Sequence, residues 1–360
     1  MTLPLVVRAF RQPRQIDRFS QAEWELLLRQ ASAARLTAAL YCLAAQLDLL
    51  GRIPAPAREH LEWTRAHGER HAQGVRTEVR EICRALDGLG MPLIFLKGAG
   101  YALAGLTPAP GRLFSDIDLL VPKERIHEVE AALMMHGWAG NHHDAYDQRY
   151  YREWMHELPP MQHIRRLSLI DVHHAILPET ARVRPQPALL RAAAVEVAGH
   201  PGCRVLAPVD MVLHSAVHLF YDGEFDHGLR DLVDIHRLLL EFGARPGFWE
   251  TLPGRAAELQ LGRPLFYALR YAVRLLGTPV PAATLAASAA ARPNRFLLVL
   301  MDGLFGRALM PPHASCSDRA TPAARFALYI RGNWLRMPPL LLARHLFHKA
   351  FITPKATSAV

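Results

Sequence analysis

The sequence predicts an α+β fold, in which a small mixed sheet lies between a helical N-terminal segment and a helical C-terminal half. Three observations predict it. Apolar residues recur at helical spacing through residues 20–50. Short apolar runs then alternate with helical patterns up to about residue 174, in the order expected of α+β proteins. After about residue 187 the pattern is almost wholly helical. We therefore divide the chain into residues 1–88, 89–186 and 187–360.

The N-terminal segment contains two helical regions. Pro54 and Pro56 interrupt the first, which covers residues 20–50. A long helix is predicted over residues 57–88, because Gly88-Leu89-Gly90 is a stop signal past a helix end.

The central segment supplies the strands. Pro122 suits the first turn of a helix, Gly137 suits its C-cap, and Pro159-Pro160 marks a turn between two strands. The predicted order is strand 92–96, helix 98–105, strand 115–121, helix 122–136, and strands 138–143, 148–157 and 160–174.

The C-terminal half is predicted to be a set of helices. Pro208 begins one of them and Gly243 ends another. Their ranges are 187–195, 208–222, 227–242, 248–260, 263–276, 293–308, 320–334 and 338–351.

Composition limits the class of protein. With 51% hydrophobic residues among 360, the chain is typical of a folded globular protein. The net charge of +9 has two explanations, an anionic partner or a general richness in arginine. The basic residues are scattered, so no motif supports nucleic acid as the partner. Four cysteines without a Cys-x-x-Cys pair fit a reducing cytosol, and we expect a cytoplasmic protein without a signal peptide or a membrane span.

Two carboxylates mark the central segment. Asp116 and Asp118 alternate with Ile117 and Leu119, so both project from one face of the predicted strand. Two carboxylates about 7 Å apart suit the oxygen ligation that Mg²⁺ prefers. Lys97-Gly98 and Arg112, upstream, extend this pair to a candidate site for phosphate and metal.

These residues resemble a known family. Leu96-Lys97-Gly98, then Arg112, then Asp116-Ile117-Asp118-Leu119-Leu120-Val121 is similar to the bacterial nucleotidyltransferase-like family of the DNA polymerase β-type superfamily. Asp171-Val172-His173-His174 resembles its third carboxylate strand. The resemblance continues through residues 208–218 and 228–235, so it covers residues from about 80 to 245.

The resemblance implies a polymerase-β-like core and an enzyme that moves a nucleoside monophosphate from an NTP to a hydroxyl-bearing acceptor. Asp116, Asp118 and Asp171 are then the catalytic residues and the ligands of two Mg²⁺ ions. Lys97, Gly98 and Arg112 bind the nucleotide. One departure concerns the turn, where the superfamily usually has Gly-Ser: Lys97-Gly98-Ala99 offers no hydroxyl, so backbone amides and Lys97 have to hold the phosphate.

Each site residue also has a structural interpretation. The three aspartates can simply end strands at the surface, and Gly98 can permit a tight turn beside a solvated Lys97. Arg112 can pair with a carboxylate instead of a phosphate. His173 shares the face of Asp171 and either touches the metal site or is a hydrogen-bonded structural residue.

Three further groups on predicted helices remain open. His214 and His218 have i,i+4 spacing, which suits a metal, a lining for the active-site cleft or packing. Arg230, Asp231 and Asp234 form either intrahelical ion pairs or a wall for the nucleobase or acceptor. The basic C-terminal run either packs on the protein or lies on an anionic membrane surface, and it comprises Arg331, Arg336, Arg344, His345, His348 and Lys349.

Two rival functions follow from these alternatives. The first is phosphoryl transfer to a peptide or glycan by the same site. The second is a non-catalytic scaffold or maturation partner that retains the fold. The acceptor and the preferred base are not encoded in any recognisable motif.

Overall fold

The computed structural model describes residues 3–140 and 154–338. Its centre is one mixed seven-stranded sheet with the order β3-β4-β5-β2-β1-β7-β6. The fold is therefore α+β, as predicted. The strands are β1 (Leu93–Phe95), β2 (Asp116–Leu120), β3 (Trp138–Gly140), β4 (Met161–His163), β5 (Leu169–His173), β6 (Val195–Val197) and β7 (His200–Val205).

The strand β2 lies in the middle of the sheet. It runs antiparallel to β1, where Ile94 pairs with Leu120, and parallel to β5, where Asp118 pairs with Asp171. On the far side of β1, the strand β7 continues the sheet in parallel. The two outer pairs, β3 with β4 and β6 with β7, are antiparallel.

Helices come before the sheet in the chain, as the sequence predicts. Ser20 and Glu23 form a reciprocal capping box that begins the second helix. The long helix ends in a short 3₁₀ turn, Asp87–Leu89, and Gly90 follows with a positive φ of 62°. These helices are α1 (Leu5–Arg11), α2 (Gln21–Ala33), α3 (Thr37–Gln46) and α4 (Ala55–Leu86).

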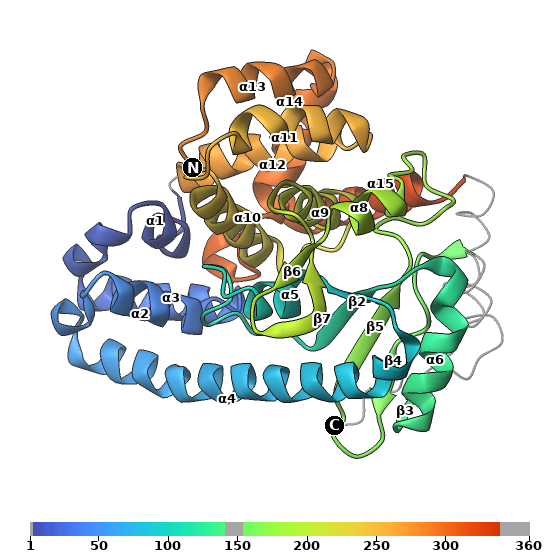
Figure 1. Ribbon diagram of the computed structural model, residues 1–360. Helices are drawn as coiled ribbons and strands as arrows, with labels where there is room; N and C mark the ends of the chain where they lie inside the picture. The colour runs from blue at the N-terminus through green and yellow to red at the C-terminus, as the bar shows by residue number, and fades with distance from the viewer. Residues whose placement is uncertain (1–2, 141–153, 339–360) are drawn as a thin grey trace.

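Two apolar layers cover the sheet (Figure 1). On one face, α4 and α6 (Ile126–Met135) pack Val79, Ile82 and Val129 against Ile117 and Leu119 of β2. The opposite face is covered by the C-terminal helices together with α5 (Lys97–Leu103), and a larger core forms there. The alternation of β2 therefore buries its isoleucine and leucine against α4 and turns its aspartates toward the C-terminal helices.

The C-terminal half is mainly helical. Gly277, with a positive φ of 67°, ends the π-helical turn Ala272–Leu276. The helices are α8 (Pro187–Ala193), α9 (Pro208–Tyr221), α10 (Gly228–Phe242), α11 (Phe248–Glu258), α12 (Gly262–Tyr271), α13 (Ala282–Ser288), α14 (Arg295–Ala308) and α15 (Thr321–Arg336). Over residues 3–140 and 154–338, no helix combines the length and the apolarity needed to cross a bilayer.

Two element predictions were wrong. The pattern after residue 187, predicted to be almost wholly helical, is interrupted by β6 and β7, which form a hairpin that adds two strands to the sheet. The strand predicted over residues 160–174 is two strands, β4 and β5, joined by a tight turn in which Leu167 has a positive φ of 59°.

Some predictions remain untested. The predicted strands 138–143 and 148–157 fall partly outside the described residues, and the helix 338–351 falls almost wholly outside them. The division of the chain at residues 88 and 186 stays a prediction.

Candidate active site

Three carboxylates meet on two neighbouring strands. Asp116 and Asp118 lie on β2, and Asp171 lies on β5 directly beside Asp118 in the parallel ladder. One ligand oxygen from each lies within 4.8 Å of the others. The structure thus brings the predicted triad together, and it does so through strand alternation and register.

The carboxyl of Asp171 is in an unfavourable environment. Its Oδ1 is buried and has no hydrogen-bond partner among the described residues. Burial, followed by the charges of Asp118 and Glu157, raises the pKa of Asp171 to about 8, although His173 opposes the shift. An unpartnered buried oxygen within an all-oxygen donor set fits a hard divalent cation such as Mg²⁺.

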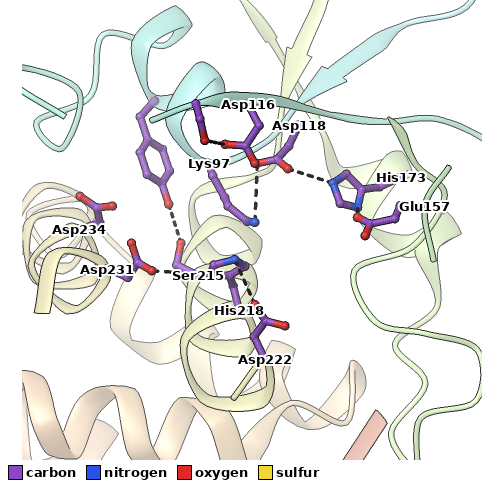
Figure 2. A network of polar contacts seen from close by, with 12 residues as sticks. Lys97, Asp116, Asp118, Glu157, His173, Ser215, His218, Asp222, Asp231 and Asp234 are labelled. Atoms are coloured by element: carbon purple, nitrogen blue, oxygen red, sulfur yellow. Dashed lines mark hydrogen bonds and ion pairs between the residues drawn. The ribbon is translucent and has the colours of Figure 1, made fainter. Parts of the chain in front are cut away.

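Asp118 is compensated by two groups (Figure 2). The Nζ of Lys97 lies 3.6 Å from its Oδ2, and the Nε2 of His173 lies 3.0 Å from its Oδ1. Burial alone would raise the pKa of Asp118, but these two neighbours outweigh it and hold the pKa well below its usual range. Lys97 is therefore a largely shielded ion-pair partner, with its side chain 16% exposed, and not a fully solvated charge.

His173 also faces a second carboxylate, that of Glu157. Its Nδ1 lies 3.0 Å from Oε2 of Glu157, which the sequence analysis missed. Burial opposes protonation, yet Glu157 and Asp118 raise the pKa of His173 to about 10, and the pKa of Glu157 falls to about 2. The prediction that His173 shares the face of Asp171 is confirmed, and its contacts match the hydrogen-bonded interpretation. With His156, these two residues also form a second group of potential metal ligands within 4.8 Å.

The turn between β1 and α5 has an unusual backbone. Lys97 has a positive φ of 39°, which is uncommon for a residue with a side chain. A Cβ on Gly98 would lie 2.5 Å from Nη1 of Arg112 and 2.7 Å from Cδ1 of Phe114. Glycine is therefore required so that Arg112 and Phe114 can pack against the turn. Phosphate binding by Lys97 and Gly98 stays a prediction.

Arg112 pairs with carboxylates of α10. Its Nε donates to Oδ2 of Asp234 at 2.6 Å, and its Nη2 lies 3.8 Å from Asp231. Arg230 pairs with Asp231 at 2.9 Å and donates to the carbonyl of Leu113. The pairing interpretation of Arg112 therefore describes this structure, and a contact between Arg112 and phosphate stays a prediction. The intrahelical ion pair of the first interpretation is formed by Arg230 and Asp231, and Asp234 pairs with Arg112.

The two histidines of α9 face the same space. Burial, followed by the charge of Lys97, lowers the pKa of both His214 and His218. His218 lies 3.9 Å from Asp222 and 3.8 Å from Asp231. Neither histidine belongs to a group of three possible metal ligands in the described part of the chain, so they line the cleft as one interpretation expected.

The basic run that begins in α15 packs on the protein where it is described. Arg331 donates to the carbonyl of Phe220 at 2.7 Å, and Arg336 pairs with Asp222 at 2.5 Å. The other residues of that run, from Arg344 onward, lie outside the described residues.

Two cavities meet at the triad, and Lys97, Asp116 and Asp118 line both. The first, of about 270 Å³, is also lined by Gly98, Arg112, Ser115, Arg230 and Asp231. The second, of about 230 Å³, is also lined by Glu157, Asp171, His173, His214, Tyr221 and Arg336. Asp116 and Asp118 thus lie where the two cavities meet, and Asp171 lines only the second.

Comparison with known families agrees with this geometry. A family model described as uncharacterised nucleotidyltransferase matches residues 20–277. The chain belongs to this family. Its match begins just before α2 and ends after the π-helical turn, so it includes the triad. No curated protein and no solved structure matches the nucleotidyltransferase.

Proposed function

We propose that this nucleotidyltransferase is Mg²⁺-dependent and moves a nucleoside monophosphate from an NTP to a hydroxyl-bearing acceptor, releasing pyrophosphate. The observation that carries the proposal is the cluster of three carboxylates within 4.8 Å, one with an unpartnered buried oxygen. Clustered anions destabilise a fold unless a cation compensates them, so a role in metal binding accounts for their cost.

The proposed metal ligands are Asp116, Asp118 and Asp171. When bound, two Mg²⁺ ions supply charge neutralisation for the attacking and leaving oxygens of an in-line displacement. In this proposal Asp118 binds the metal while its carboxylate also contacts His173 and Lys97. Asp171, which lies only in the second cavity, faces the acceptor hydroxyl in this proposal.

The first cavity is the proposed site for the phosphates of the NTP. Its walls carry Lys97, Arg112 and Arg230, whose charges suit phosphate oxygens. Ser115 adds a hydroxyl, which donates to Oδ1 of Asp116 at 3.2 Å. This hydroxyl lies at the start of β2 and is a candidate for the polar contact that the Lys97-Gly98-Ala99 turn lacks.

The second cavity is the proposed acceptor site. His214 and Tyr221 come from α9, and Arg336 closes the cavity from the end of α15. Its volume of about 230 Å³ fits one small hydroxyl-bearing group of a larger acceptor. We place the reaction in the cytoplasm, which agrees with the four cysteines being free thiols.

The test uses the purified chain, Mg²⁺, and each NTP labelled either at the α or at the γ phosphate, with a deproteinised cell extract as the source of acceptors. Nucleotidyl transfer moves the α label to a product and releases pyrophosphate. Transfer of the γ label instead would identify phosphoryl transfer. If neither the α label nor the γ label is transferred, and Asp116→Asn behaves like the native protein, the proposal is refuted and a binding scaffold remains.

A further inference from the structure

A line of three charged side chains runs from the triad into the second cavity (Figure 2). Asp118 accepts from Nε2 of His173 at 3.0 Å, and Nδ1 of His173 lies 3.0 Å from Glu157. All three are shielded from solvent, since the side-chain exposure is 8% for Asp118, 9% for His173 and 17% for Glu157. This line involves no residue of the phosphate cavity except Asp118.

Contacts on both sides fix the orientation of the ring. Nε2 of His173 lies 3.0 Å from the Asp118 carboxylate, and Nδ1 lies 3.0 Å from the Glu157 carboxylate. The ring is therefore anchored on both sides and cannot turn without breaking a contact to a carboxylate. Glu157 thus determines the orientation of His173.

The backbone fixes Glu157 in this position. Glu157 forms an isolated antiparallel bridge with His173, although it lies in no strand. The amide of Leu158 donates to the carbonyl of Val172, and the amide of His174 donates to that of His156. Residues on both sides of Glu157 are thus tied to β5, and its carboxylate is carried beside the ring.

The Asp118 carboxylate depends on this arrangement. Within residues 3–140 and 154–338, its hydrogen bond comes from His173 alone, because Lys97 remains 3.6 Å away. We propose that Glu157 is a positioning residue of the metal site: acting through His173, it fixes the Asp118 carboxylate in the orientation that binds the divalent cation. This inference rests on the proposed function, since it takes Asp116, Asp118 and Asp171 as the metal ligands.

The proposal predicts a specific defect. In Glu157→Gln an amide replaces the carboxylate beside Nδ1, and an amide can present either its oxygen or its nitrogen to the ring, so the donor to Asp118 is no longer fixed. Loss of such an outer contact typically weakens metal affinity by about 10–100-fold. Glu157→Asp keeps the charge but shortens the side chain, so its affinity lies between those of the native protein and Glu157→Gln.

The experiment is a Mn²⁺ titration of the full chain followed by electron paramagnetic resonance, which reports metal binding without any substrate. Glu179→Gln is the matched control, because Glu179 is an exposed glutamate whose carboxylate pairs with Lys123. This control titrates like the native protein. A double variant, Glu157→Gln with His173→Gln, binds Mn²⁺ no more weakly than His173→Gln alone, because Glu157 acts only through the ring.

Two results overturn the proposal. One is a Mn²⁺ affinity of Glu157→Gln equal to that of the native protein, and the other is a double variant in which the losses of Mn²⁺ affinity of the two single variants add. Far-ultraviolet circular dichroism checks folding, and Glu157→Asp carries the same comparison if Glu157→Gln does not fold. Failure of the proposed function has a different signature, because there the native protein binds no Mn²⁺ or Asp118→Asn binds it unchanged. If Asp118→Asn loses Mn²⁺ and Glu157→Gln does not, only the positioning role is refuted.

Discussion

Replacing Asp171 by Asn is expected to stabilise the metal-free protein while it removes metal-dependent turnover. The side chain keeps its size, but a carboxyl that ionises in the unfolded chain is replaced by an amide that stays neutral in both states. Oδ1 of Asp171 has no hydrogen-bond partner among the described residues, so the amide breaks no bond there. An Asn amide can also donate toward the neighbouring carboxylates, which lie within 4.8 Å.

The magnitude follows from the pKa of Asp171, which burial and nearby anions raise from 3.8 to about 8. Between these values the unfolded chain ionises while the folded chain keeps its proton, so stability falls as the pH rises through this window. Neutral pH lies about three pH units above 3.8, and each unit costs the folded native protein roughly 1.4 kcal/mol, so the total destabilisation is on the order of 4 kcal/mol. For 360 residues, with an unfolding entropy of about 2.1 cal/mol/K per residue, this corresponds to a rise of about 5 °C in Tm.

The assay is thermal unfolding in a chelator, from about pH 4 to pH 9, for the native protein and Asp171→Asn. The difference in Tm between them should be near zero at about pH 4, grow up to about pH 8 and remain constant above it. Asp226→Asn is the control, because the side chain of Asp226 is 80% exposed and its ion pair with Arg325 contributes little. Adding Mg²⁺ should raise the Tm of the native protein more than that of Asp171→Asn.

A difference in Tm that is flat across this pH range, or a lower Tm for Asp171→Asn, would refute the reasoning. Either result would mean that the carboxylates do not repel one another in the folded protein. An equal response of both proteins to Mg²⁺ would separately remove Asp171 from the metal ligands.

Three further changes test other parts of the molecule. Lys97→Ala should weaken NTP binding by about 1–3 kcal/mol in calorimetry, and unchanged affinity would remove Lys97 from the phosphate site. Gly98→Val should lower the free energy of unfolding, measured in urea, by about 1–3 kcal/mol, because the new side chain displaces Arg112. Gly74→Ala, in open space on α4, should instead stabilise by about 0.5–1 kcal/mol, and equal effects would contradict the packing argument. Burial lowers the pKa of His236 from 6.5 to about 4, so the free energy of unfolding of the native protein should fall by about 3 kcal/mol as the pH falls between these values. His236→Gln should not show this fall when unfolding in urea is measured across the same pH range.

The triad was predictable because strand periodicity is a local property. Ile117 and Leu119 had to face a core, so Asp116 and Asp118 had to face the opposite way, and the structure confirms this. Asp171 followed from the same alternation on a second apolar run. What the sequence did not contain was the parallel register that sets Asp118 beside Asp171.

The missed hairpin has a local cause. The β6 strand has only three residues, and its first two residues are exposed, so it carries no apolar run that distinguishes a strand. The turn within residues 160–174 was missed because Leu167 adopts a positive φ without being glycine, which composition does not signal.

Two contacts of the site were out of reach for a different reason. Arg112 and Asp234 are separated by 122 positions, and many carboxylates were equally available as partners. Glu157 lies in no regular element, and both its backbone bridge to β5 and its side-chain contact with His173 join residues that no sequence pattern pairs. Such contacts depend on the tertiary arrangement, which spacing along the chain does not specify.

The pairing of β2 with β5 has a consequence for how this chain tolerates length changes. Distances along a strand are fixed at about 3.3 Å per residue, so the separation of Asp118 and Asp171 depends on the ladder and not on the segment that connects the strands. Insertions in that connection are expected to leave the carboxylates in place where they spare Glu157 and its pairing with β5. A single-residue deletion within β5, however, turns Asp171 to the face where Ile170 and Val172 now pack. Length changes within the two strands are therefore expected to disrupt the site, whereas those in the connection disrupt it only where they displace Glu157.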